Sequence, residues 1–134
     1  MASFRYDLSL RIEHPSADLA LVCSQLGMTP KIIWRAGEPR TTPVGNPLTG
    51  NRDQSYCSTP IDHPADFSLA EALDALLDRL MANRKIFDEL AATGGSGNVF
   101  VGWYSGPNSG ERFDPSLLSR HSALGLSLDL DVYC

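Results

Sequence analysis

The sequence predicts one α+β domain over residues 1–134, with a mostly antiparallel sheet that carries its helices on one face. Its 134 residues suit a single hydrophobic core, because half of this length is close to the lower limit for independent folding. Segments that alternate between apolar and polar residues lie near both ends of the chain, and segments with helical periodicity lie between them. Strands with one apolar and one polar face are typical of an antiparallel sheet that is covered on one side.

The first part of the chain is expected to form a strand, a short helix and a second strand. Every second residue from Phe4 to Ile12 is apolar, so one face of this strand meets a core and the other meets water. Ser16 is the expected N-cap of an amphipathic helix with apolar residues at positions 19, 22, 23 and 26, and Gly27 suits its left-handed exit. Lys31–Arg35 contains β-branched and aromatic residues, which predict a strand.

A long loop is expected from Ala36 to Ser55, because three prolines and three glycines in this segment disfavour regular structure. Loops of this length inside compact domains are usually functional or disordered. Tyr56–Ile61 is a weaker strand candidate, and Pro60 places it at a sheet edge or at the end of the strand.

A long helix and a buried strand are expected next. Ser68 and Glu71 form a capping box at the start of the helix. A leucine-rich seam then predicts one helix over Leu69–Ala92, about 36 Å long, with Asn83 filling one step of the seam. Val99–Tyr104 is apolar on both faces, which is typical of a central strand.

The last part of the chain predicts a third helix and a final strand. Asp114 is a suitable N-cap, Pro115 suits the first helical position, and Gly125 suits the exit. Residues 126–133 then alternate between apolar and polar. The complete order is β-α-β-β-α-β-α-β, which contains the ferredoxin-like β-α-β-β-α-β unit followed by a C-terminal α-β.

The charge and cysteine content limit the classes of partner. Eleven basic against 16 acidic residues give a net charge of −5, so we expect nucleic acid not to be the main partner. The first residues lack the features of a signal peptide and no segment has the length of a membrane span, so we expect no membrane and a cytoplasmic location. Cys23, Cys57 and Cys134 are widely spaced without a Cys-x-x-Cys pair, so we expect reduced thiols and neither a metal nor a cofactor.

Several short segments resemble one family of bacterial proteins. The segments are Leu26–Pro30, Trp34–Pro39, Val99–Gly102 and Leu124–Tyr133, together with the leucine-rich helix that ends in glycines. Over nearly the whole chain the sequence resembles the domain of unknown function 4279 family. The resemblance implies a small bacterial domain with no assigned activity, and it provides no catalytic residues to transfer.

The segment from Trp34 to Arg52 is the first candidate site. From Lys31 to Arg52 there are four basic residues and one acidic residue, a local charge of +3 in an acidic protein. The guanidinium groups of Arg35, Arg40 and Arg52 suit a carboxylate or phosphate group. The alternative is that these arginines pair with acidic side chains and only keep the loop soluble.

Asp129 and Asp131 are the second candidate. They stand two apart on a strand, so their carboxylates share one face about 7 Å apart. Such a pair suits a hard cation or acid–base chemistry. Cross-strand pairing with Arg5 or Arg11 would explain them without any function.

Other residues carry weaker signals. Cys57, Asp62, His63, His121 and Ser122 are potential parts of a nucleophilic site, but no Gly-x-Ser-x-Gly elbow is present and His121 falls on the apolar side of its helix. We therefore assign no catalytic residue.

Three aromatic residues are expected on the outer face of the sheet, and they are Phe100, Tyr104 and Tyr133. Such residues could stack the bases of single-stranded RNA, but the neighbouring aspartates favour a protein interface instead.

Two hypotheses follow for the function. The leading one is a non-catalytic binding or protein-interaction domain, whose partner is another protein or a second copy; an immunity protein that blocks a toxin is one such case. The alternative is an enzyme or sensor for a small anionic metabolite, held by the arginines of residues 35–52 with Asp129 or Asp131 nearby. Convergence of these residues on one pocket favours the alternative, whereas a flat apolar patch favours a partner.

Overall fold

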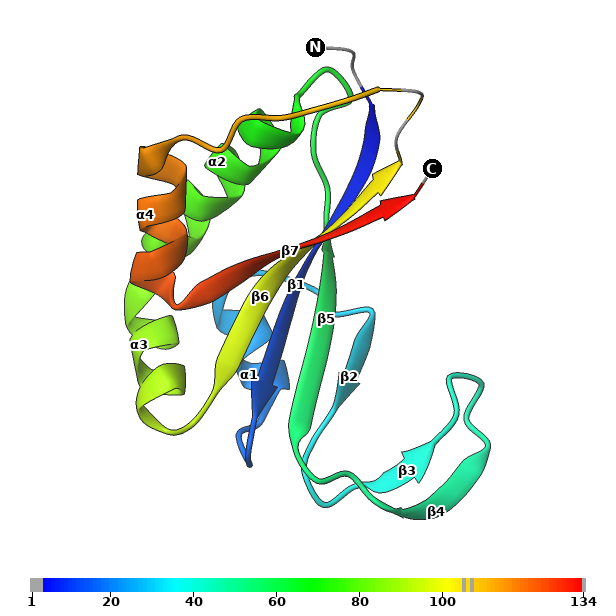
Figure 1. Ribbon diagram of the computed structural model, residues 1–134. Coiled ribbons are helices and arrows are strands. Elements are labelled where there is room, and N and C mark those ends of the chain that lie inside the picture. Colours follow the sequence, from blue (N-terminus) through cyan, green and yellow to red (C-terminus); the bar gives the residue numbers. More distant parts are fainter. Residues whose placement is uncertain (1–3, 105, 107, 134) are drawn as a thin grey trace.

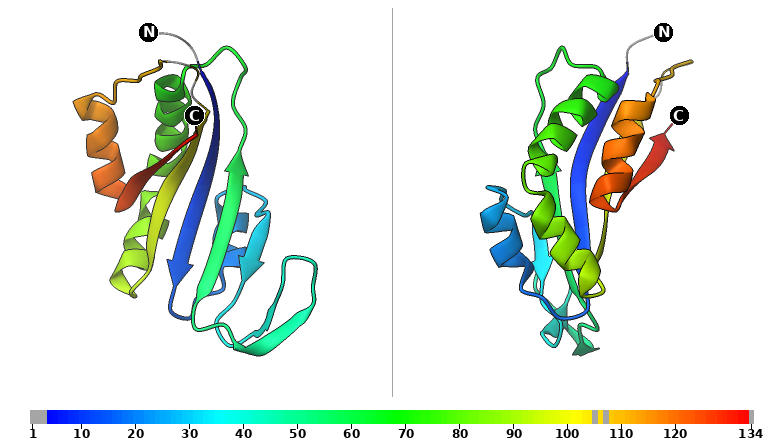
Figure 2. Two further views of the ribbon diagram at one scale, coloured as in Figure 1. Left: turned by 45° about the vertical axis from the view of Figure 1, so that its right-hand side comes forward. Right: turned by 90° about the vertical axis from the view of Figure 1, so that its left-hand side faces the viewer.

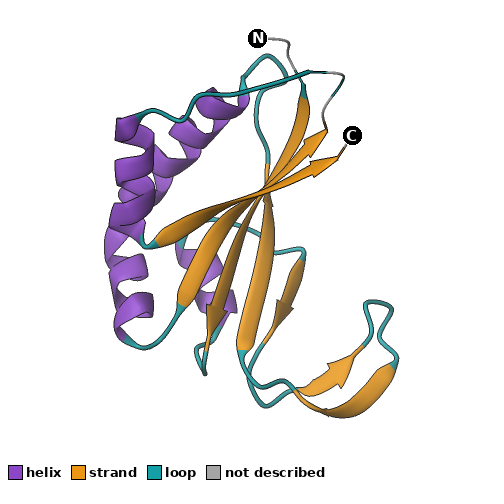
Figure 3. Ribbon diagram, in the orientation of Figure 1, coloured by secondary structure: helices purple, strands orange, loops and turns teal. Residues whose placement is uncertain are grey.

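The computed structural model describes residues 4–104, 106 and 108–133 (Figure 1). The elements in chain order are β1 (Arg5–His14), α1 (Leu19–Gln25), β2 (Ile32–Trp34), β3 (Pro39–Thr41), β4 (Pro47–Asn51), β5 (Ser55–Ile61), α2 (Leu69–Met81), α3 (Arg84–Ala92), β6 (Ser96–Tyr104), α4 (Pro115–Leu124) and β7 (Leu126–Tyr133). The predicted α+β class is confirmed. Figure 3 shows the helices gathered on one side of the main sheet.

The main sheet has the strand order β2-β5-β1-β6-β7, so the first strand of the chain is its centre. β1 pairs antiparallel with both β5 and β6, and β2 pairs antiparallel with β5. Only β7 runs parallel to its neighbour β6, because α4 connects these two strands as a crossover. The prediction of a mostly antiparallel sheet is therefore confirmed.

The core lies between one face of this sheet and the helices (Figure 2). The apolar side chains of β1 that alternate in the sequence are buried, with Leu10 at 1% and Ile12 at 2% exposure. α2 faces them with Leu73, Leu77 and Leu80, each fully buried. Burying one such side chain contributes about 2 kcal/mol, so these leucines contribute strongly to the stability of the fold.

The prediction of a single long helix over residues 69–92 is wrong, because the chain forms two helices that are separated at Asn83. The Asn83 side chain donates to the carbonyl of Arg79 at 3.3 Å, and its backbone leaves the helical region at φ −118° and ψ 27°. Asparagine favours such local bonds over a continuous helix. The change of direction lets α2 and α3 follow the twisted sheet (Figure 2).

The prediction of a structureless loop over residues 36–55 is also wrong, because β3 and β4 form a small antiparallel hairpin there. Gly37, Gly45 and Gly50 have φ between 86° and 91°, a region that other residues rarely adopt. Gly45 lies in the connection between the two strands, Gly37 in the turn before β3 and Gly50 within β4, so the glycines that suggested irregular structure are part of the hairpin and its approach. Figure 1 shows this hairpin projecting away from the rest of the domain.

The predicted helix ends are confirmed at four places, including the left-handed Gly27 after α1 at φ 67°, and wrong at one. Ser68 and Glu71 form the capping box, Asp114 accepts from the amide of Leu117, and Gly125 is left-handed at φ 68°. α1, however, is capped by Asp18 and not by Ser16, because the Asp18 carboxylate accepts from the amide of Ala20.

We predict opposite effects for two substitutions in β6. A Cβ at Gly97 would lie 2.8 Å from the Leu126 side chain and 3.0 Å from the carbonyl oxygen of Arg11, so Gly97→Ala should lower the free energy of unfolding by about 1–3 kcal/mol. Gly102→Ala is the matched control in the same strand, because its nearest neighbour lies at an ordinary 3.4 Å and alanine removes the entropic cost of glycine. Urea denaturation of both variants measures this, and equal losses would contradict the packing described here.

Candidate functional site

The face of the main sheet opposite the helices is not covered by any described helix (Figure 2). The register of the strands decides which side chains lie there together. From the three strands β1, β6 and β7 they are Arg5, Asp7, Ser9, Arg11 and Glu13 of β1, Asn98, Phe100 and Tyr104 of β6, and Ser127, Asp129, Asp131 and Tyr133 of β7. We call this set the open face. It combines aromatic rings with charges of both signs.

Arginines cover the aromatic rings of the open face. The Arg5 guanidinium lies 4.2 Å from the ring centre of Tyr104, and the Arg11 guanidinium lies 3.8 Å from that of Phe100. Tyr104 also stacks on Tyr133, with ring centres 5.2 Å apart. Each cation–ring contact is worth about 0.5–1 kcal/mol at an exposed position. The structure thus places Phe100, Tyr104 and Tyr133 on the outer face, with the ring faces already in contact with protein groups.

Asp129 and Asp131 lie on β7 at one edge of the sheet. Asp129 accepts from the Asn98 side chain at 2.6 Å, and Asp131 accepts from the hydroxyl of Tyr133. This bond to Asp131 raises the pKa of Tyr133. In the described residues neither aspartate forms an ion pair with Arg5 or Arg11, because those arginines lie over aromatic rings.

Trp34 and the three arginines hold the base of the hairpin at the opposite edge. Arg52 stacks on Trp34 at 3.8 Å, and the Trp34 indole donates to the carbonyl of Gln54 at 3.1 Å. Arg52 donates to the Thr41 carbonyl at 2.9 Å and Arg40 to the Thr49 carbonyl at 3.1 Å, so each links the two arms of the hairpin. The Arg35 side chain donates to the carbonyl of Ser16 at 3.3 Å.

The structure therefore separates the six sequence candidates into two groups. Trp34 belongs to β2 and the aspartates belong to β7, with β5, β1 and β6 between them. At about 4.8 Å per strand, these edges are roughly 19 Å apart. The two groups do not share a pocket.

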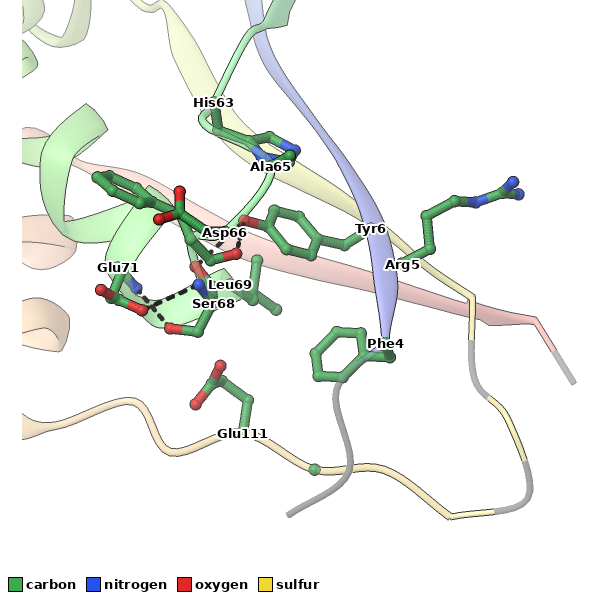
Figure 4. Close-up of a pocket in the computed structure, with 12 residues that line it drawn as sticks. Phe4, Arg5, Tyr6, His63, Ala65, Asp66, Ser68, Leu69, Glu71 and Glu111 are labelled. Atoms are coloured by element: carbon green, nitrogen blue, oxygen red, sulfur yellow. Dashed lines mark hydrogen bonds between the residues drawn. The ribbon is translucent and has the colours of Figure 1, made fainter.

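A cavity lies away from both groups, at the start of β1 and of α2 (Figure 4). Its volume is about 750 Å³. Phe4, Tyr6 and His63 form its aromatic wall, with Tyr6 and His63 stacked at 4.3 Å. Asp66, Glu71 and Glu111 line the other side, and Figure 4 shows the Arg5 guanidinium directed away from them.

The polar groups of this cavity also hold the start of α2. The Tyr6 hydroxyl lies 2.8 Å from the carbonyl oxygen of Phe67 and 3.1 Å from that of Ser68, so it donates to this pair of acceptors. Glu71 caps the helix, and Glu111 accepts from the amide of Ala70 at 3.2 Å. Burial and then the charges of Glu71 and Glu111 raise the pKa of Tyr6. A site with this potential repels an anion.

The potential nucleophile Cys57 and the potential bases His63 and His121 each contact other residues and not one another. Cys57 is buried with its sulfur 3.8 Å from that of Cys23, and the hydrogen bond with Cys23, followed by burial, raises the pKa of the Cys57 thiol. His63 stacks on Tyr6, and His121 is buried with Nδ1 3.2 Å from the carbonyl oxygen of Leu126. Cys23 and Cys57 are free thiols, whereas Cys134 lies outside the described residues.

Two features were missed at the level of sequence. The Cys23–Cys57 contact joins α1 to β5, and its only signal was that both residues occupy apolar positions of their elements. The cavity wall at Tyr6 had a clearer signal, because a tyrosine at a core-facing strand position needs a partner for its hydroxyl. Where that partner lies depends on how the chain folds back at residues 62–68.

The fold and these surfaces define a small α+β domain with one helix-covered sheet face, one open face and a projecting hairpin. The chain belongs to the family described as "Domain of unknown function (DUF4279)", which matches residues 4–134. This confirms the family that the sequence segments resemble. No curated protein and no solved structure matched the chain in two further comparisons. No helix among the described residues is long and apolar enough to cross a membrane.

We predict that Tyr6→Phe lowers the free energy of unfolding by about 1–2 kcal/mol, because it leaves the carbonyls of Phe67 and Ser68 without this donor. Tyr133→Phe is the control, since that hydroxyl is exposed and its loss should cost under about 0.5 kcal/mol. Urea denaturation measures both. A Tyr6 variant as stable as the control would show that this bond does not hold the start of α2.

We also predict that His121 makes stability depend on pH. Burial lowers the pKa of His121 in the folded protein, so below about pH 6.5 the unfolded state binds a proton that the folded state resists. Stability should therefore fall as the pH is lowered from about 7.5 to about 5.5, and His121→Gln should reduce this slope. Urea denaturation at several pH values tests this, and an unchanged slope in the variant would contradict it.

Proposed function

We propose that this domain is a non-catalytic protein-interaction module that binds its partner through the hairpin and the open face. The hairpin carries this proposal. All eight residues of β3 and β4 are exposed, and Val44 at the tip is 83% exposed. A two-stranded hairpin is marginal on its own in water, so a hairpin without a core is best explained as a surface presented to another molecule.

The contacts at the hairpin base support the same function. The bonds from Arg40 and Arg52 across the two arms hold the hairpin in shape before a partner arrives. Preorganisation of this kind reduces the entropy lost on binding. Val44 and Leu48 supply apolar area, and the open face supplies arginine and tyrosine, the residue types enriched in protein interfaces.

The alternative, a site for a small anionic metabolite, has weaker support. Arg35, Arg40 and Arg52 already donate to carbonyl oxygens, and they lie far from the aspartates. The cavity at the start of α2 has three carboxylates in its lining, from Asp66, Glu71 and Glu111. These observations favour a protein partner over an anion. An immunity-type role, in which the partner is a toxin, is one form of this proposal, and the free thiols Cys23 and Cys57 suit a reducing cytoplasm.

The experiment replaces residues 39–51 by Asn-Gly, which suits a tight turn because the Arg52 amide already donates to the Glu38 carbonyl at 2.8 Å. The melting temperature should change by less than about 3 °C, since no core is removed. Partner binding should weaken at least about tenfold, measured with a partner captured from host cells and then purified.

Lys85→Ala on α3 is the matched control, because Lys85 is exposed on the helix side and should leave both properties unchanged. The proposal fails if the hairpin variant retains full affinity for every purified partner. It also fails if removing the hairpin unfolds the domain, since the hairpin then has a structural role.

A further inference from the structure

The final strand of the main sheet has an unpaired edge. Among the residues that the structure describes, β7 pairs only with β6 and is the terminal strand of the sheet. It is eight residues long, whereas β2 at the other edge has three. Proteins usually protect long edge strands with proline, lysine or a covering segment, and the sequence of β7 contains neither proline nor lysine.

The two sides of β7 differ in chemistry. On the side of the helices α4 covers its start, where Leu126 is 6% exposed, but Leu130 and Val132 are 44% and 53% exposed. On the open face the same part of the strand carries Asp129 and Asp131. The uncovered half of β7 thus presents an apolar row and an acidic row beside free backbone groups.

Pairing of two β7 edges from two copies is disfavoured. Residues directly opposite each other in antiparallel strands point to the same face. A symmetric pairing centred on Asp129, Leu130 or Asp131 therefore places two aspartates opposite each other, which is destabilising. In these three registers the aspartates disfavour a second copy, whereas basic side chains at the opposite positions would be favourable.

We infer that the β7 edge binds an extended segment of a partner protein in which basic and apolar residues alternate. This rests on the proposed protein-interaction function. Backbone hydrogen bonds add the segment as a sixth strand, its apolar side chains cover Leu130 and Val132, and its lysines or arginines meet Asp129 and Asp131. The net charge of −5 also favours encounter with a basic segment.

Three labelled hexapeptides test this inference in fluorescence anisotropy with the full chain. The first alternates valine and lysine, the second alternates valine and glutamate, and the third is the lysine peptide with N-methyl groups on alternate amides to block strand pairing. The lysine peptide should bind at least about tenfold more tightly than the other two, and NMR shifts should concentrate in β6 and β7.

Charge reversal provides the second arm. D129K/D131K should invert the preference, so that the glutamate peptide binds more tightly than the lysine peptide. D53K/D88K is the control, because it changes the net charge equally at two exposed positions outside the main sheet and should keep the original order. Thermal melts confirm that both variants fold.

The inference is overturned if the N-methylated peptide binds as well as its parent, if the control inverts the preference as strongly as D129K/D131K, or if no peptide binds. These results leave the proposed function standing when the hairpin replacement still abolishes binding of a purified partner. If instead the peptides bind as expected and hairpin loss has no effect, the hairpin-based proposal fails and the edge site remains.

Discussion

The packing of the α2 leucines against the buried face of β1 is the contact on which the rest of the structure depends. β1 is the centre of the main sheet, so a shift of one residue in its pairing would expose its whole apolar row. With Leu10 and Ile12 buried on the side of the helices, the alternate residues Asp7, Ser9 and Arg11 must face the other way. The open face is therefore a direct consequence of the same contact that stabilises the core.

The elements with strong periodicity could be predicted from the sequence because local physics decides them. Alternation over β1 and β7, the capping box at Ser68 and the left-handed Gly125 each depend on a few adjacent residues. The break at Asn83 and the hairpin over residues 39–51 could not be predicted in this way. The apolar seam continues on both sides of Asn83, so the preference for two helices depends on the curvature of the sheet that they cover. The hairpin depends on contacts between residues far apart in the sequence, those of Arg52 with Trp34 and Thr41.

The candidate site residues were harder to place than the elements, because sequence spacing carries no information on strand order. Trp34 and Asp129 both belong to short polar–aromatic segments, yet they lie at opposite edges of the sheet. The same limit applies to the alternative in which Arg5 or Arg11 pairs with the aspartates, because these arginines lie over Tyr104 and Phe100. The rings lie on β6, next to the arginines on β1, whereas the aspartates lie one strand further away on β7. Stacking on the nearer ring keeps the guanidinium group partly hydrated, and an exposed ion pair with the more distant carboxylate would add little stability.

Short acidic side chains suit an edge that must reject its own copy and still admit another strand. An aspartate holds its charge close to the backbone, so two of them in opposed strands cannot separate their charges by changing rotamer. A lysine or arginine opposite an aspartate has a long flexible stem and reaches the carboxylate without moving the backbone. The bond from Asn98 to Asp129 and the bond from Tyr133 to Asp131 keep both carboxylates oriented in the free domain. Protection from self-association and selection of a basic partner therefore follow from the same two residues.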